Sequence, residues 1–128
     1  MAIYQGSDLR KITGGLKRPN RDKRKYELGS APTETKLSDM HVVKVERVMG
    51  GNEKVKVVYA QYANVYDPVE KRSKKVKITA VLETPANREY ARRGIIVKGT
   101  IIQTEIGKAV VTSRPGQDGT VNALLLKE

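Results

Sequence analysis

From residue 41 onward, apolar and polar residues alternate in short runs, which is the pattern of β-strands with one buried face. Residues 41–49 and 54–59 form two such runs on either side of a glycine-rich turn at residues 50–52. In the second run, valines and lysines fall on opposite faces. The two runs therefore predict a β-hairpin.

Further strands are expected at residues 76–82, 107–112 and 120–126. Residues 94–104 form either one strand with a bulge at Gly99 or two strands, 94–97 and 100–104. Turns are expected where Asn, Asp, Pro and Gly gather, at residues 64–68 and 114–119. In the strand at 76–82, the side chains predicted to point inward are Val76, Ile78, Ala80 and Leu82.

One segment has the signals of a helix. Thr84 is placed as the N-cap, Pro85 as the first helical residue and Gly94 as the stop. These positions predict about two turns over residues 85–93. Two arginines fall in the last turn, where the helix dipole favours positive charge.

Short strands separated by turn signals favour a small closed or half-closed barrel over alternating strand and helix units. The predicted fold is mainly β: a barrel of about six strands with one short helix and an extended basic N-terminal arm. The arm covers residues 1–29, and the barrel body covers residues 30–128. Residues 30–40 begin the body as a polar connector.

The arm is strongly basic. Residues 10–25 hold eight basic residues and one acidic residue, but only two aliphatic side chains, Ile12 and Leu16. Such a segment buries too little apolar surface to offset its ordering entropy, so we expect it to be disordered when free. It is a solvated tail, an import-like signal or an arm that binds nucleic acid. Arginine grips phosphate, and adjacent glycines allow close backbone approach, which favours the third interpretation. The candidate RNA-binding residues of the arm are Arg10, Lys11, Thr13, Gly14, Gly15, Lys17, Arg18, Arg21, Lys23, Arg24 and Lys25.

The body adds positive charge of its own. Residues 71–77 carry five basic residues and are expected to line one loop, and a second group surrounds the predicted helix. Each group alone is equally compatible with an ordinary solvated face, but together they favour an anionic partner. The candidate RNA-binding residues here are Lys74, Lys75, Arg88, Arg92, Arg93 and Lys98.

Composition limits the other possibilities. The 128-residue chain has a net charge of +11 and no cysteine, and its only histidine, His41, lacks partner ligands at metal spacing. We therefore predict no catalytic residue, metal, cofactor or small-molecule substrate. No apolar run approaches a membrane span and no secretory signal is evident, so a soluble intracellular protein is expected. Six tyrosines without Phe or Trp weigh against the common modules that stack bases on aromatic rings.

The residues also resemble a known family. The arm matches the pattern Arg-Lys-Ile-Thr-Gly-Gly at residues 10–15, followed by Arg21 and by residues 23–29. Further matches occur in order at residues 50–52, 64–68, 85–87, 92–93 and 112–123. Together they resemble the archaeal and eukaryotic small-subunit ribosomal protein family called S-eight, e-type, in its short archaeal form.

This resemblance implies a small β-barrel with a basic N-terminal segment threaded into RNA. The expected partners are small-subunit ribosomal RNA and neighbouring ribosomal proteins, with no membrane, and the expected location is the cytoplasmic ribosome. The resemblance adds Arg114 to the candidate RNA-binding residues, with Asp118 expected to brace the same turn or to pair with an arginine. A DNA-binding, chromatin-like architectural protein is the alternative, since a net charge of +11 suits it equally.

Overall fold

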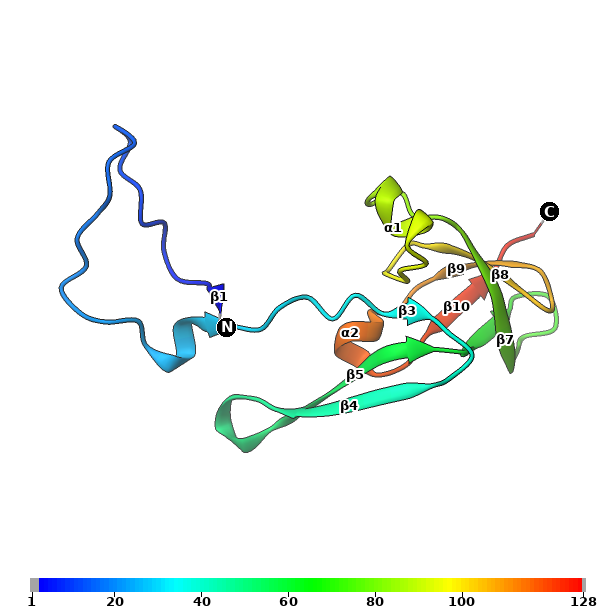
Figure 1. Cartoon of the computed structure of the whole chain (residues 1–128). Helices are drawn as coiled ribbons and strands as arrows, with labels where there is room; N and C mark the ends of the chain where they lie inside the picture. Colours follow the sequence, from blue (N-terminus) through cyan, green and yellow to red (C-terminus); the bar gives the residue numbers. More distant parts are fainter. Residues whose placement is uncertain (1–2, 128) are drawn as a thin grey trace. The chain divides into compact units, whose positions relative to one another are not determined.

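The computed structural model describes residues 3–127 and is mainly β. The chain divides into two compact units, one through Pro32 and one from Thr33 onward (Figure 1). Each unit is described by itself.

The N-terminal unit is a loop whose two ends pair with each other. Strand β1 (Ile3–Tyr4) runs antiparallel to β2 (Leu28–Gly29), directly after the short 3-10 helix η1 (Lys25–Glu27). No side chain between Ile3 and Pro32 is buried. The unit is therefore held by backbone and polar contacts instead of a hydrophobic core.

The body is built mostly of strands. A hairpin of β4 and β5 encloses the 3-10 helix η2, and two short α-helices lie between later strands. The elements are β3 (Lys36–Leu37), β4 (Val42–Arg47), η2 (Met49–Gly51), β5 (Glu53–Ala60), β6 (Tyr62–Asp67), β7 (Arg72–Glu83), α1 (Arg88–Arg92), β8 (Ile101–Thr104), β9 (Lys108–Val111), α2 (Pro115–Asp118) and β10 (Asn122–Leu125).

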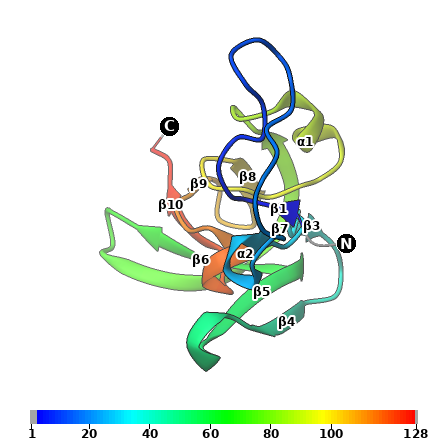
Figure 2. The ribbon, with the colours of Figure 1, turned by 90° about the vertical axis from the view of Figure 1, so that its left-hand side faces the viewer.

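Five of these strands form a closed barrel in the order β10-β6-β7-β8-β9. The last strand closes it, because β10 pairs parallel with β6 and antiparallel with β9. A second sheet has the order β3-β5-β4, and its β4–β5 hairpin extends away from the barrel in Figures 1 and 2. The predicted small β-barrel and the predicted hairpin are confirmed, and the body has two short helices where one was expected.

The core of the body is aliphatic, and Ile95, Ile96 and Ile102 are among its largest fully buried side chains. The buried residues that pack together come from β5 through β10 and the adjoining turns. Burying such side chains stabilises a domain by roughly 1.5–3 kcal/mol each. This core fixes the barrel wall, whose outer surface and connecting turns carry the basic residues of the body.

The turn predicted at residues 64–68 is wrong. Residues 62–67 form β6, whose Ala63 and Val65 are buried. The turn comes afterwards, at residues 68–71, where the Asp67 carboxylate accepts a hydrogen bond from the Val69 amide at 2.8 Å. The basic tract at residues 71–77 is correspondingly not a loop, because β7 begins at Arg72.

The inward alternation predicted for residues 76–82 holds for Val76 and Ile78 but fails at its end. The pairing of β7 with β8 shifts register twice, between Ile78 and Ala80 and between Val81 and Glu83. As a result Val81 packs against the core, whereas Leu82 is 45% exposed. A one-residue slip reverses which face a strand residue occupies.

The helix begins later than predicted. Pro85 belongs to a turn closed by the Asn87 amide, which donates to the Thr84 carbonyl at 3.1 Å. Asn87 is the N-cap, and its side chain accepts a hydrogen bond from the Glu89 amide at 3.0 Å. The Thr84 hydroxyl is buried instead, 3.4 Å from the hydroxyl of Thr100.

Four further segments differ from expectation. Residues 94–97 form no strand, because Ile95 and Ile96 are both buried and the chain does not alternate there. Gly99 lies in a turn and not in a bulge. The turn predicted at 114–119 contains the four-residue helix α2, which ends at Gly119 with a φ of 75°. The polar connector at 30–40 contains β3.

No helix among residues 3–127 is long and apolar enough to cross a membrane.

Candidate nucleic-acid interface

The tip of the N-terminal loop is a tight turn with an accessible backbone. The Gly14 amide donates to the Lys11 carbonyl at 2.9 Å, and the Lys11 amide donates to the Gly15 carbonyl at 2.8 Å. Gly14 has a φ of 84°, which favours glycine, and no atom lies within 4 Å of where its Cβ would be. Thr13 is exposed beside it. Phosphate oxygens can therefore approach this backbone closely.

Two of the predicted cations hold the neck of this loop together. The Arg10 guanidinium donates to the Gly14 carbonyl at 2.9 Å, and the Lys17 ammonium donates to the Asp8 carbonyl at 3.1 Å. The Asp8 carboxylate accepts from the Arg10 amide at 2.9 Å. These contacts shape the loop, so Arg10 and Lys17 have a positioning role as well as a positive charge.

A third cation closes the base of the loop. Arg21 donates to the Glu27 carboxylate at 2.6 Å, and the same carboxylate accepts from the Arg24 amide at 3.1 Å. The hydrogen bond from Arg21, followed by that from Arg24, holds the pKa of Glu27 below its usual range. The Glu27 carbonyl accepts from the Gln5 amide at 2.7 Å, next to the pairing of β1 with β2. Glu27 is therefore the acceptor around which the base is organised.

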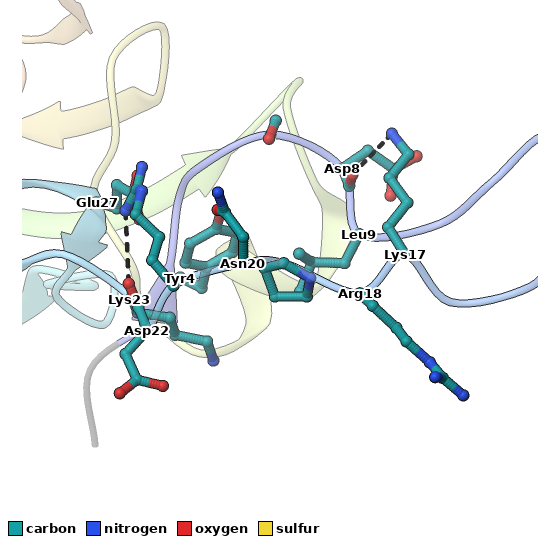
Figure 3. A pocket seen from close by; sticks show the side chains of 12 residues that line it. Tyr4, Asp8, Leu9, Lys17, Arg18, Asn20, Asp22, Lys23 and Glu27 are labelled. Carbon is teal, nitrogen blue, oxygen red and sulfur yellow. Dashed lines mark hydrogen bonds and ion pairs between the residues drawn. The ribbon is translucent and has the colours of Figure 1, made fainter.

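These groups surround a concave pocket of about 400 Å³ within the N-terminal unit (Figure 3). Lys23 places its ammonium 5.3 Å from the centre of the Tyr4 ring, while Arg18 points away from the other labelled side chains. The lining combines both signs of charge with small apolar surfaces: Tyr4, Ser7, Asp8, Leu9, Lys17, Arg18, Pro19, Asn20, Arg21, Asp22, Lys23 and Glu27.

The N-terminal unit thus contains two kinds of cation. Arg10, Lys17 and Arg21 are engaged with acceptors of the loop itself. Within residues 3–127, no side-chain partner engages the three exposed cations Lys11, Arg18 and Lys25. The second group can accept a new anionic partner without breaking an existing contact.

In the body, helix α1 carries two of the predicted arginines, Arg88 and Arg92, and the third, Arg93, is its C-cap. Arg92 pairs with Glu89 at 3.2 Å, and Arg93 pairs with Glu34 at 2.8 Å. Arg88 has no ion pair or side-chain hydrogen bond in the described part of the chain, and neither does Lys98 in the turn after the helix. Gly94, with a φ of 67°, ends the helix as predicted.

The predicted lysines of β7 lie beside the β6–β7 turn. Lys74 pairs with Glu70 at 2.8 Å, and this hydrogen bond raises the pKa of Lys74. Lys75 lies over the ring of Tyr62, with its ammonium 4.8 Å from the ring centre. Figures 1 and 2 draw this turn apart from α1, so the two basic groups of the body lie on separate elements.

Arg114 directly precedes α2. Its backbone amide donates to the Asp118 carboxylate at 2.8 Å, which confirms that Asp118 braces this turn. The guanidinium of Arg114 has no ion pair among the residues that the structure describes. No group of three or more potential metal ligands occurs within residues 3–127.

Comparison with known proteins decides the family. A family model described as "Ribosomal protein S8e" matches residues 4–126. The chain belongs to the ribosomal protein S8e family. This confirms the resemblance read from the sequence motifs.

Curated relatives match over their full length. The chain is 72% identical over 128 residues, all of both chains, to the "Small ribosomal subunit protein eS8" of Sulfolobus acidocaldarius. It is 70% identical over 128 residues, again all of both chains, to the protein of that name in Sulfurisphaera tokodaii. For the Ignicoccus hospitalis protein the identity is 62%, covering 99% of this chain and 98% of the relative.

Sequence reasoning did not identify the acceptors that organise the loop. Asp8 and Glu27 are absent from the predicted site because a search for phosphate-binding residues selects cations and not carboxylates. The spacing of Arg24 and Glu27 was a usable signal, since an acidic residue three positions after a helix cap commonly accepts its amide. The RNA-binding role of the predicted basic residues stays a prediction.

Proposed function

We propose that the chain is a structural constituent of the small ribosomal subunit that binds and stabilises small-subunit ribosomal RNA, with neighbouring ribosomal proteins as further partners. Its membership of the ribosomal protein S8e family supports this function. The RNA contact is supported by two features of the N-terminal unit: the exposed, unengaged cations Lys11, Arg18 and Lys25, and the open glycine turn at residues 11–15. No chemical step is proposed, and the role is one of scaffolding.

The proposed mechanism is neutralisation of phosphate charge. Lys11, Arg18 and Lys25 bind backbone phosphates, and the amides around Gly14 supply additional donors. Arg10, Lys17 and Arg21 keep the loop in a shape that presents these groups. Lys74, Arg88, Arg92, Arg93, Lys98 and Arg114 contribute further contacts from the body.

The salt dependence of RNA binding tests this mechanism. Each phosphate contact contributes about 0.7 to the slope of log affinity against log salt for single strands. We expect a Lys11→Gln, Arg18→Gln, Lys25→Gln variant of the full chain to lower this slope by about 2 for small-subunit ribosomal RNA. Filter binding or fluorescence anisotropy at several salt concentrations measures it.

The matched control is a Lys44→Gln, Lys54→Gln, Lys127→Gln variant, which removes the same charge from exposed residues outside the predicted site. Its slope of log affinity against log salt should change by less than about 0.7, the contribution of one phosphate contact. An equal loss in both variants would show that binding follows net charge alone, and would contradict a specific role for the N-terminal unit.

The DNA-binding alternative is tested with the same protein. Structured small-subunit RNA should bind more tightly than duplex DNA of equal length at matched salt, because recognition of RNA uses its shape and 2′-hydroxyls. Equal affinity would favour a chromatin-like architectural protein.

We also propose that the N-terminal arm, residues 1–29, becomes fully ordered only on RNA. No side chain of residues 3–29 is buried, which supports this, since little apolar burial opposes the ordering entropy. Trypsin should cut the free protein within residues 10–25 first, and bound RNA should protect those sites. A free arm that resists trypsin as well as the barrel does would contradict the proposal.

A further inference from the structure

The outer face of β6 exposes two aromatic rings. Tyr62, Asn64 and Tyr66 alternate along this strand with Ala63 and Val65, which are buried in the barrel. Tyr62 is 37% exposed and Tyr66 is 41% exposed, on a strand whose other face is in the core. The rings are thus held on a rigid wall while part of their surface stays open to solvent.

Neighbouring strands surround these rings with polar and basic groups. On β7, Lys77 lies opposite Tyr62, and Ser73 lies opposite Tyr66. Lys75 lies opposite Asn64, and on the other side of β6 Asn122 of β10 is paired with Asn64. We call this set the tyrosine face: Tyr62, Asn64, Tyr66, Ser73, Lys75, Lys77 and Asn122. It contains two lysines, of which Lys77 lies 4.0 Å from the exposed carboxylate of Asp39 on the connector before β4.

We infer that the tyrosine face binds unpaired RNA nucleotides, with bases stacked on Tyr62 and Tyr66. This inference rests on the proposed binding of ribosomal RNA and extends it from phosphates to bases. Aromatic rings and lysines together are the combination that single-stranded nucleic acids require: a stacking surface and a countercharge for the phosphates.

The position of Lys75 is consistent with the binding of an unpaired nucleotide. Its ammonium now lies 4.8 Å from the centre of the Tyr62 ring. An exposed cation–π contact contributes about 0.5–1 kcal/mol, whereas a base stacked on an aromatic ring contributes about 1–3 kcal/mol. A base can therefore displace the ammonium, and the flexible lysine can turn to the phosphate of the same nucleotide.

Between the rings lies a pair of amides. The Asn64 Nδ2 donates to the Asn122 Oδ1 at 3.2 Å. Within residues 3–127 this is the only hydrogen bond of either side chain, so the Asn64 Oδ1 and the Asn122 Nδ2 present an acceptor and a donor to solvent. Such groups can bond the edge of a base that lies between the two rings.

The spacing of the rings identifies the class of RNA. Residues i and i+4 on a strand are about 13 Å apart, which is close to four steps of stacked bases at 3.4 Å. Neighbouring bases of a regular helix cannot stack on both rings. The tyrosine face therefore suits bases that are splayed apart, as in a bulge, an internal loop or an extended single strand.

The test uses the full chain and two RNA probes: a single-stranded oligoadenylate of ten nucleotides, and a fully paired RNA duplex. A Tyr62→Leu, Tyr66→Leu variant keeps a strand-compatible apolar side chain but removes both rings. We expect its affinity for the single strand to fall about tenfold or more, with affinity for the duplex unchanged. Its salt slope should equal that of the wild type, because no charge is altered.

Two controls accompany this variant. Tyr62→Phe, Tyr66→Phe retains the rings and should bind the oligoadenylate within about twofold of the wild type. Tyr59→Leu removes a tyrosine that is similarly exposed, at 39%, but lies on β5, and it should leave affinity unchanged. Equal unfolding midpoints for all variants separate binding from stability.

The outcomes distinguish this inference from the proposed function. If the double leucine variant binds the single strand within twofold of the wild type, or if the phenylalanine variant loses as much, the stacking role is wrong. The proposed function fails separately, if neither ribosomal RNA affinity nor its salt slope responds to the Lys11, Arg18 and Lys25 substitutions.

Discussion

The N-terminal unit and the barrel body carry almost the same net charge but obtain their structure in different ways. Residues 1–32 hold eight basic and three acidic residues, a net charge of +5, and the remaining 96 residues hold +6. The body buries a continuous aliphatic core, whereas no side chain of residues 3–32 is buried. The contacts of the loop are exposed ion pairs and hydrogen bonds, which contribute little in water. The body therefore has a hydrophobic core of its own, and we propose that the loop needs a partner to become fully ordered.

The largest expected difference between the two regions is in the unfolding free energy lost when an isoleucine of each is shortened to alanine. Ile102 is 0% exposed in β8, and Ile12 at the loop tip is fully exposed. Ile102→Ala should lower the free energy of unfolding by about 2–5 kcal/mol, because it removes core contacts and leaves a cavity. Ile12→Ala should change it by less than about 0.5 kcal/mol. Chemical denaturation measures both, and similar values would contradict the contrast.

A smaller effect is expected where the body packs closely against a glycine. A Cβ on Gly119 would lie 2.6 Å from a methyl carbon of Val55, and its φ is 75°. Gly119→Ala should cost about 2–4 kcal/mol, from the clash together with the left-handed backbone.

Gly51 is the matched control for Gly119. It has the same φ of 75°, and no atom lies within 4 Å of its Cβ position. Gly51→Ala should cost only the backbone term, about 1–2 kcal/mol. Equal losses of unfolding free energy would mean that the contact between α2 and β5 is looser than described.

Helix N-caps occur in both the N-terminal unit and the body, and removing one is expected to have a smaller effect on unfolding free energy than the changes above. Asn87 caps α1 in the body by accepting from the Glu89 amide at 3.0 Å. Asn87→Ala should cost about 1 kcal/mol of unfolding free energy, measured by thermal denaturation. It should also reduce RNA affinity if the arginines of α1 bind phosphate. Unchanged stability would show that the turn at residues 84–87 starts the helix without the cap.

The smallest effect on unfolding is expected at the base of the loop. The pKa of Glu27 is lowered in the folded loop, so its contribution is present above the ordinary carboxyl pKa of about 4.3 and is lost as pH falls through the lowered value. The protection of the Gln5 and Arg24 amides against hydrogen exchange, relative to their intrinsic rates at each pH, should fall in that acidic range, while the β8 amides keep their protection.

Glu27→Gln should abolish this pH dependence and leave the unfolding of the body unchanged. Loop amides whose protection relative to the intrinsic rate stays constant across the acidic range in the wild type would contradict the role given to Glu27.

The sequence was most informative where burial alternates along the chain. The β4–β5 hairpin, the barrel and the family motifs were all predictable, because valine-rich alternation and turn residues act locally. Leu82 was misplaced because the register shifts of β7 depend on its pairing with β8, which no local pattern reveals. The start of α1 was misplaced because Thr84 is buried against Thr100, sixteen residues away.

The candidate site was also only partly predictable from local sequence. The sequence identifies the basic residues, but it does not show which of them are paired with acceptors of the same chain. Arg21 and Arg18 look equivalent in the sequence, yet the first is paired with Glu27 and the second points away from the other labelled side chains of Figure 3. The exposure of Tyr62 and Tyr66 was also hidden, because residues 64–68 contain turn-forming letters while β6 is fixed by pairing with β7 and β10.

The position of β10 in the barrel has a consequence for biosynthesis. This strand lies between β6 and β9, so the sheet stays open until the last residues of the chain are made. Ribosomes add about 5–20 residues per second. The basic N-terminal segment is therefore synthesised roughly 5–20 seconds before β10 closes the barrel. During that interval the basic N-terminal segment of the nascent chain is present while the barrel is still open. A chaperone or an early RNA contact would therefore act on this segment before the barrel closes.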